Sequence, residues 1–139
     1  MVMSGERDKS TARLKMISPQ FVVPDVVAAA EYYRDVLGFQ ILGYFYKPPV
    51  YSIIRRDAVE IHLGRADLNA DASAAPNTAY REGSIDAYLW VDDVELLYGE
   101  LQGRGAHIVE PPTTREYKCR EMIVEDKFGF RLAFATDIS

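Results

Sequence analysis

Apolar and polar residues alternate along a short run in the middle of the chain, residues 85–91. Successive side chains of a strand point to opposite faces of its sheet. One face of this run is ordinary core material: Ile85, Ala87, Leu89 and Val91. The other face carries Asp86, Tyr88 and Trp90, the only tryptophan of the chain. The run predicts a strand whose second face serves something other than the core.

Two longer segments, "VPDVVAAAEYYRDVLGFQIL" and "VDDVELLYGELQGRGAHIVE", repeat one set of helix signals. Asp25 stands near the start of the first, and Gly38 follows it by thirteen residues. Asp92 and Gly105 have the same spacing in the second, and Glu95 is placed to complete a capping box with Asp92. Asp favours helix N-caps, Gly favours the residue after a helix, and apolar residues recur between them at helical spacing. Each span therefore predicts a helix of about three turns.

Strand patterns flank both helices. In the first half they cover residues 17–23, 40–46, 50–55 and 59–63, and in the second half 85–91, 107–110, 121–125 and 130–135. Each half reads strand, helix, then three strands, which is an internal duplication. The sequence predicts an α+β fold of two tandem βαβββ modules that form a curved, mostly antiparallel sheet with the helices outside.

The modules divide the chain into four parts. Residues 1–15 are expected to be a mobile N-terminal tail, and residues 16–63 form the first module. A segment rich in Ala, Asp, Asn and Ser, residues 64–84, is expected to be a linker with a short helical turn. Residues 85–139 form the second module, and the two modules make one structural domain.

Composition limits the expected number of domains, the cellular location and the kinds of partner. The chain has 139 residues, 48% of them hydrophobic, which suits one compact domain. It has no apolar run of about 18 residues and no secretory leader, so no membrane contact and a cytoplasmic location are expected. A single cysteine, Cys119, excludes an internal disulfide. The net charge of −5 argues against a nucleic-acid partner and favours cationic ligands.

One helix covers only one face of a four-stranded sheet, so the face with Asp86, Tyr88 and Trp90 is predicted to line a cavity. A carboxylate in a dry core would be costly without a partner. The structural alternative is that Asp86 pairs with Arg120 or Arg131 and that the two rings belong to the core or to a dimer seam.

Three segments carry a resemblance to a known family: "AAAEYYRDVLGF" (28–39), "WVDDVELLYGEL" (90–101) and "REMIVEDKFGFRLAF" (120–134). Together with the duplicated module they resemble the vicinal oxygen chelate superfamily of glyoxalase I, extradiol dioxygenases, fosfomycin-resistance transferases and bleomycin-resistance proteins. The similarity is closest to the bleomycin-resistance branch and covers roughly residues 16–136. It implies a homodimer in which modules of two chains complete each cavity, sometimes by exchange of the N-terminal strand.

The resemblance also implies where a divalent metal would sit in the enzymes of the superfamily. The corresponding positions are Ser18, Glu60 or His62, Asp86 and Ala133. Alanine cannot bind a metal and serine is a poor ligand, whereas metal catalysis normally uses about three protein ligands. The expectation is therefore that the metal site has been lost and that no cofactor is needed.

The leading hypothesis is a protein that binds and sequesters a small cationic, aromatic molecule such as a bleomycin-like antibiotic, with no catalytic residue. The expected ligand-binding residues are Ser18, Gln20, Glu60, His62, Asp86, Tyr88, Trp90 and Tyr117. Which of Glu60 and His62 faces the cavity is left open, and His62 has the simpler alternative of bonding a neighbour. The second hypothesis is a metal-dependent lyase, isomerase or dioxygenase that holds its ion at His62, Glu60 and Asp86.

Overall fold

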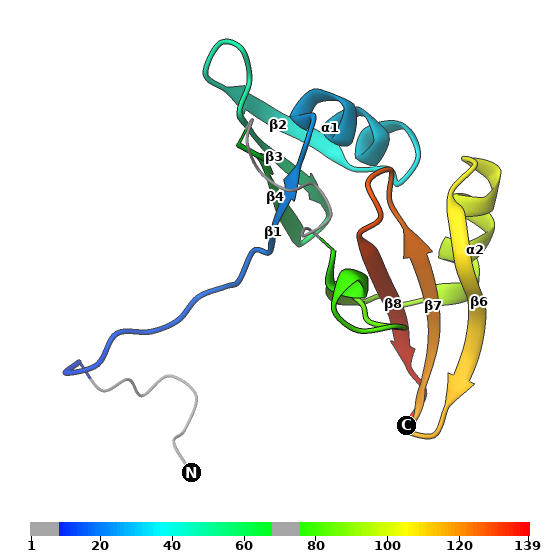
Figure 1. Cartoon of the computed structure of the whole chain (residues 1–139). Helices are drawn as coiled ribbons and strands as arrows, with labels where there is room; N and C mark the ends of the chain where they lie inside the picture. Colours follow the sequence, from blue (N-terminus) through cyan, green and yellow to red (C-terminus); the bar gives the residue numbers. More distant parts are fainter. Residues whose placement is uncertain (1–8, 68–75) are drawn as a thin grey trace.

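The computed structural model describes residues 9–67 and 76–139, which form two halves that lie side by side (Figure 1). Residues 1–8 of the expected tail and residues 68–75 of the expected linker lie outside these ranges. The segment that precedes the first strand runs away from the body of the molecule in Figure 1. Among the described residues, no helix combines the length and the hydropathy that crossing a membrane requires.

The first half is one βαβββ module. Its elements are β1 (Gln20–Val23), α1 (Val26–Asp35), β2 (Gln40–Phe45), β3 (Tyr51–Arg56) and β4 (Val59–Arg65). The strand order across the sheet is β1-β4-β3-β2. β1 runs parallel to β4 because α1 and two further strands separate them along the chain, and the other pairs are antiparallel.

The second half repeats this module. A short 3₁₀ turn, η2 (Asn77–Ala79), precedes it in the expected linker. Its elements are β5 (Ala87–Trp90), α2 (Val94–Gly103), β6 (His107–Arg115), β7 (Cys119–Glu125) and β8 (Arg131–Asp137), with the strand order β5-β8-β7-β6. The predicted α+β class and tandem modules are confirmed. Within the chain, the strands belong to two four-stranded mixed sheets rather than to one continuous sheet.

Both helices begin at an aspartate, but the second does not begin where the sequence suggested. Asp25 caps α1, and its Oδ1 accepts a hydrogen bond from the Ala28 amide at 3.0 Å. The cap of α2 is Asp93, not Asp92, and its Oδ1 accepts from the Leu96 amide at 3.1 Å. Either of two adjacent aspartates could fill this role, so the sequence signal was ambiguous by one residue. Glu95 consequently falls in the first turn and pairs with Arg120 instead of forming a capping box with Asp92.

The first strand is shorter than predicted. The Pro19 carbonyl still accepts a hydrogen bond from the His62 amide at 2.9 Å, but β1 begins only at Gln20. Proline has no N–H to continue a ladder, and before it the chain leaves the sheet. Ile17, the first residue of the predicted strand, is 89% exposed as a result.

The strands predicted at residues 107–110 and 121–125 are longer than expected and form a hairpin. β6 extends to Arg115 and β7 begins at Cys119, so only residues 116–118 form the turn. Lys118 adopts the left-handed conformation in this turn, with φ of 61°. The many charged side chains concealed the strand pattern, because they lie on both faces of the hairpin.

Alternate strand residues pack under the helices. The inward residues of β4 and β5 are buried, whereas their neighbours in the sequence are partly or largely exposed on the opposite face. A single apolar cluster runs through both modules and includes Phe21, Leu37, Phe39, Leu89, Leu97 and Phe134. Burial of these side chains on both sides of the boundary joins the modules into one hydrophobic core.

Polar groups also connect the modules. Tyr33 of α1 is fully buried, and its hydroxyl donates to Asp126 Oδ2 at 2.7 Å. Asp126 Oδ1 accepts from the Phe128 and Phe130 amides, both at 2.9 Å. Burial raises the pKa of the Asp126 carboxyl to about 6, although these hydrogen bonds act in the opposite direction. The Phe130 ring stacks on Phe21 of the first module at 4.5 Å.

This pKa predicts a pH-dependent stability. An aspartate in the unfolded chain ionises near pH 4, whereas Asp126 in the folded chain ionises at about 6. Between these values the folded chain holds a proton that the unfolded chain lacks, so the free energy of unfolding falls as the pH rises from about 4 to about 6, by roughly 1–3 kcal/mol. Asp126→Asn keeps an acceptor for the two amides and cannot titrate, so urea unfolding of this variant should lack that decline.

The exposed Asp67 supplies a matched control, since Asp67→Asn makes the same chemical change outside the core. Parallel stability profiles for Asp126→Asn and the unmodified protein across this pH range would contradict the assignment.

Candidate functional site

β5 places Tyr88 and Trp90 on the sheet face that is left uncovered by the helices of the described residues. Leu89 points inward and is 8% exposed, whereas Tyr88 and Trp90 are 39% and 64% exposed. Their partners in register on β8 are Ala133 and Ala135, which are too small to cover the rings. The two rings meet edge to face, with centroids 5.3 Å apart. The chain thus exposes an indole and a phenol ring above a floor of alanines.

The carboxylate beneath these rings belongs to Glu121 of β7, a residue that sequence reasoning did not select. Glu121 is 4% exposed and pairs in register with Ala135, which is also the partner of Trp90. Its Oε1 accepts from the Tyr88 hydroxyl at 2.6 Å and from the Tyr117 hydroxyl at 2.9 Å, and its Oε2 accepts from Arg115 Nε at 2.9 Å. The alternation of Glu121 with the buried Met122 was a usable signal, because it assigns Glu121 to the uncovered face.

These contacts fix the charges of the group, which we call the Glu121 cluster: Tyr88, Trp90, Glu110, Arg115, Tyr117 and Glu121. Burial alone would raise the pKa of the Glu121 carboxyl, but hydrogen bonds from Tyr88, Tyr117 and Arg115 outweigh it, and the pKa lies below its usual value. Burial, followed by hydrogen bonds to Cys119 and Glu121, holds the pKa of Tyr88 far above its usual value. Arg115 also binds Glu110 at 2.8 Å. The cluster therefore holds two carboxylates and one guanidinium, which leaves one excess negative charge.

A second polar group lies on the uncovered face of the first sheet. Glu60 and His62 point to the same side of β4, opposite the buried Ile61 and Leu63. Glu60 Oε2 lies 3.0 Å from His62 Nε2 and accepts from the Ser18 hydroxyl at 3.3 Å. The sequence left the choice between Glu60 and His62 open, and the structure places both side chains on this face.

The partners of Glu60 and His62 orient both side chains and favour the charged form of Glu60. Arg55 donates to Glu60 Oε1 at 2.7 Å, and the Tyr51 hydroxyl lies 2.8 Å from His62 Nδ1. Hydrogen bonds from His62 and then Arg55 lower the pKa of Glu60 to about 2. Gln20 is the register partner of His62 on β1 and completes the group.

Asp86 has a different position from the one expected. It lies just before β5, where its Oδ1 accepts from the Asn77 amide at 2.7 Å and its Oδ2 accepts from the Arg131 amide at 2.8 Å. The side chain ties the start of β5 to β8 and to η2. The sequence also allowed Asp86 to pair with the guanidinium of Arg120 or Arg131. In the structure, Arg131 binds Glu125 and Arg120 binds Glu95.

The eight expected site residues therefore fall into separate places. Ser18, Gln20, Glu60 and His62 lie together on the first sheet, Tyr88, Trp90 and Tyr117 lie together on the second, and Asp86 is held by backbone amides. Of the positions that a metal would use, Ser18, Glu60 and His62 lie together, whereas Asp86 accepts hydrogen bonds from backbone amides and Ala133 offers no donor atom. Within the described ranges, no three His, Cys, Asp or Glu side chains gather as a metal site.

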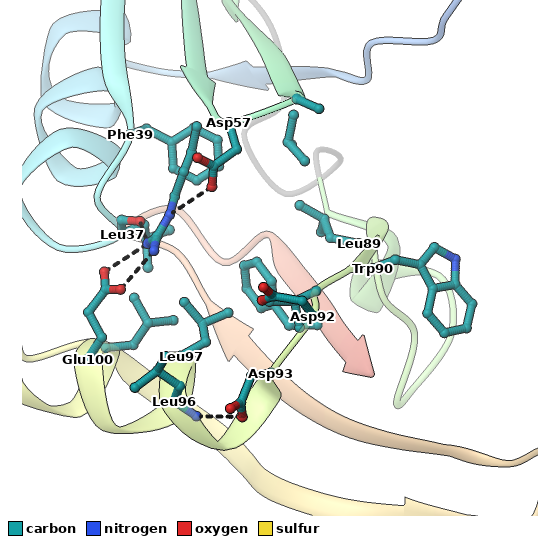
Figure 2. Close-up of a pocket in the computed structure, with 16 residues that line it drawn as sticks. Leu37, Phe39, Asp57, Leu89, Trp90, Asp92, Asp93, Leu96, Leu97 and Glu100 are labelled. Carbon is teal, nitrogen blue, oxygen red and sulfur yellow. Dashed lines mark hydrogen bonds and ion pairs between the residues drawn. The ribbon is translucent and has the colours of Figure 1, made fainter. Parts of the chain in front are cut away.

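A pocket of about 390 Å³ lies between the two modules (Figure 2). Leu89 borders it, whereas the Trp90 side chain points away from its centre. β5 thus presents alternate residues to two different environments: the pocket between the modules and the uncovered face of the second sheet.

Comparison with known proteins agrees with this architecture. The family model described as Glyoxalase/Bleomycin resistance protein/Dioxygenase superfamily matches residues 13–134. A bleomycin-binding protein complexed with bleomycin is similar in structure, with a TM-score of 0.69 and 17% identity over 89% of this chain and 99% of that chain. TioX from Micromonospora sp. ML1 has a TM-score of 0.67 and 18% identity, over 88% of this chain and 98% of that chain.

A further similar structure is a bleomycin resistance determinant encoded on the transposon Tn5. Its TM-score is 0.69 and its identity 17%, over 89% of this chain and 98% of that chain. At these identities the solved structures support the fold alone. No curated protein sequence matches the chain.

The Glu121 cluster predicts a large effect from one substitution. Glu121→Ala would leave Arg115 and the Tyr88 hydroxyl without their buried acceptor, so we expect the free energy of unfolding to fall by roughly 2–4 kcal/mol. Glu116→Ala, at an exposed position of the same hairpin, should change it by less than about 0.5 kcal/mol. Urea denaturation measures both variants, and equal effects would show that the cluster contributes little to folding.

Proposed function

The chain belongs to the Glyoxalase/Bleomycin resistance protein/Dioxygenase superfamily, and we propose that it binds and sequesters a small, planar, cationic molecule. The observation that carries this proposal is the Glu121 cluster, in which the Tyr88 and Tyr117 hydroxyls bind a buried carboxylate and the exposed Trp90 ring packs against Tyr88. A structural role alone gives no reason to leave an indole 64% exposed on a strand whose other face supplies the core.

The physical basis is attraction between a cation and an aromatic face. Each stacking or cation–π contact contributes on the order of 0.5–2 kcal/mol. The excess negative charge of the cluster adds to this attraction, and the tyrosine hydroxyls are already directed at Glu121, so their ring faces are what a guest meets. A bleomycin-type glycopeptide is the guest that the family suggests, and other planar cations satisfy the same chemistry. The proposal needs no metal ion.

The group on the first sheet supplies the second half of the proposed site. The Glu60 charge is engaged by Arg55, so this half offers hydrogen-bonding atoms around His62, Tyr51 and Ser18 rather than a free charge. We propose that a homodimer brings this half of one chain to the Glu121 cluster of its partner. β1 and β5 are edge strands, and edges of this kind tend to be covered.

Trp90→Phe tests the guest-binding role. The side chain is largely exposed and Phe retains most of its apolar area, so the melting temperature should stay nearly unchanged. Calorimetric titration with bleomycin and a panel of cationic aromatic compounds should show affinity reduced by roughly tenfold, the loss expected for about 1.4 kcal/mol. Tyr44→Phe, on β2 of the other module, provides a control for an unrelated aromatic change.

Trp90 also reports binding in the unmodified protein, because no second indole exists. The proposal is wrong if its emission ignores every compound of the panel while Trp90→Phe lowers the melting temperature by many degrees.

The proposed homodimer predicts twice the chain mass of 15.7 kDa by light scattering at micromolar concentration. The segment before β1 exposes Leu14, Met16 and Ile17 by 96%, 67% and 89%, and we expect it to pack on the partner. Leu14→Asp combined with Ile17→Asp should then yield monomers, whereas Ile138→Asp, at an exposed position near the C-terminus, should not. A mass of one chain for the unmodified protein would contradict the dimer.

A further inference from the structure

The pocket between the modules shares one residue, Trp90, with the Glu121 cluster. Its walls come from both halves of the chain: the end of α1 and the turn between β3 and β4 on one side, and β5, α2 and β8 on the other. Leu89 and Trp90 both border the pocket, and Figure 2 shows the indole ring pointing away from the pocket centre, so a molecule at the centre would meet Leu89 rather than the ring. The pocket is therefore not explained by the proposed function.

Apolar side chains form most of the pocket wall. They are Leu37, Phe39, Val59, Leu89, Leu97 and Phe134. Leu96 of α2 also borders the pocket and is 73% exposed, which is unusual for a leucine beside a core. A volume of about 390 Å³ lies within the range typical of pockets for small organic ligands. Such a space favours an occupant with an apolar body.

The charged residues that border the pocket determine which sign of charge a bound molecule should carry. Arg56 is bound to Glu100, with Nη1 at 2.8 Å from Oε2 and Nη2 at 2.7 Å from Oε1, and its Nε also lies 3.8 Å from Asp57 Oδ2. One guanidinium therefore faces two carboxylates here, which leaves one excess negative charge. Three aspartates also border the pocket: Asp57 in the turn between β3 and β4, and Asp92 and Asp93 before α2. Asp92 and Asp57 are exposed, and Figure 2 shows Asp57 directed toward Arg56 and Asp92 on the strand end of the other module. The border is thus anionic, and a cation complements it.

We propose that this pocket is a second binding site, which takes a small molecule with an apolar body and a single ammonium group. The body lies against Leu89 and Leu97, and the ammonium group lies between Asp57 and Asp92. Such a ligand contacts both modules at once. It would stabilise their association by mass action, because the unfolded chain has no such site.

Octylammonium is a suitable probe, since it has an apolar chain, one positive charge and no aromatic ring. 1-Octanol and octanoate are matched probes that replace the cation with a neutral group and with an anion. Methyl-labelled leucine spectra in NMR locate the binding independently of Trp90. We expect octylammonium to shift the methyl signals of Leu89, Leu96 and Leu97, and to leave those of Leu42 and Leu132 unchanged.

The affinity should follow the order octylammonium, octanol, octanoate. Asp92→Asn should weaken octylammonium binding by roughly two- to fivefold, the range typical of one exposed charge pair, and leave octanol binding unchanged. Asp67→Asn, an exposed aspartate outside the pocket, should affect neither probe. Asp93 is left intact because it caps α2.

Three results would overturn this proposal. Equal affinity for all three probes would mean a purely apolar void, and shifts spread over all leucines would mean non-specific binding. Shifts of the same pocket signals on raising the protein concentration without any probe would mean that a second copy of the chain occupies the pocket. Each of these outcomes leaves the proposed role of Trp90 to be decided by its own titration.

Discussion

Each sheet of this chain has two faces, and the described residues provide one α-helix for each sheet. That shortage determines which side chains are exposed on the sheets. α1 and α2 bury one face of their sheets, and the alternation of strand side chains then exposes the residues between the buried ones. On β5 the exposed residues are Tyr88 and Trp90, and on β4 they are Glu60 and His62. Both groups of expected site residues are a direct consequence of a face that the chain cannot cover by itself.

The same shortage explains why the modules are joined by polar as well as apolar contacts. Two small modules share one apolar cluster, and a buried tyrosine and a bidentate ion pair cross the boundary at Tyr33–Asp126 and Arg56–Glu100. Buried polar groups are costly unless they are satisfied, so the Tyr33–Asp126 pair favours one relative placement of the modules, and the partly exposed Arg56–Glu100 pair adds to this preference. These polar pairs fix the orientation of the two modules, whereas a small apolar core alone would allow the modules to slide against each other. The carboxyl of Asp126 also makes this boundary sensitive to pH, because its protonated form is favoured by burial.

The fold could be predicted from the sequence because its signals are local. Asp25, Gly38 and Gly105 mark helix ends through backbone geometry, and both glycines have the positive φ that the pattern implied. Errors arose where two neighbours offered the same chemistry, as with Asp92 and Asp93, or where a missing N–H ended a strand, as at Pro19. The site was harder to predict than the fold. Asp86 and Glu121 are both carboxylates within strand patterns of the sequence, and they differ only in their tertiary position. The Arg131 and Asn77 amides hold Asp86, and these amides come near it only in the folded chain.

The position of the negative charge decides what the exposed rings can recognise. If Asp86 had faced the site, a carboxylate at the strand end would have met solvent and been screened. Glu121 instead lies beneath Tyr88 and Tyr117, where the surroundings are less polar and an electrostatic interaction is stronger. Its hydrogen bonds also turn both phenol groups inward, so that the outer surface presents aromatic faces instead of hydroxyls. A guest suited to aromatic faces near a buried carboxylate is a cation with a broad, weakly hydrated surface. For a small, strongly hydrated ion, the free-energy cost of losing water would exceed the gain from contacts with the rings.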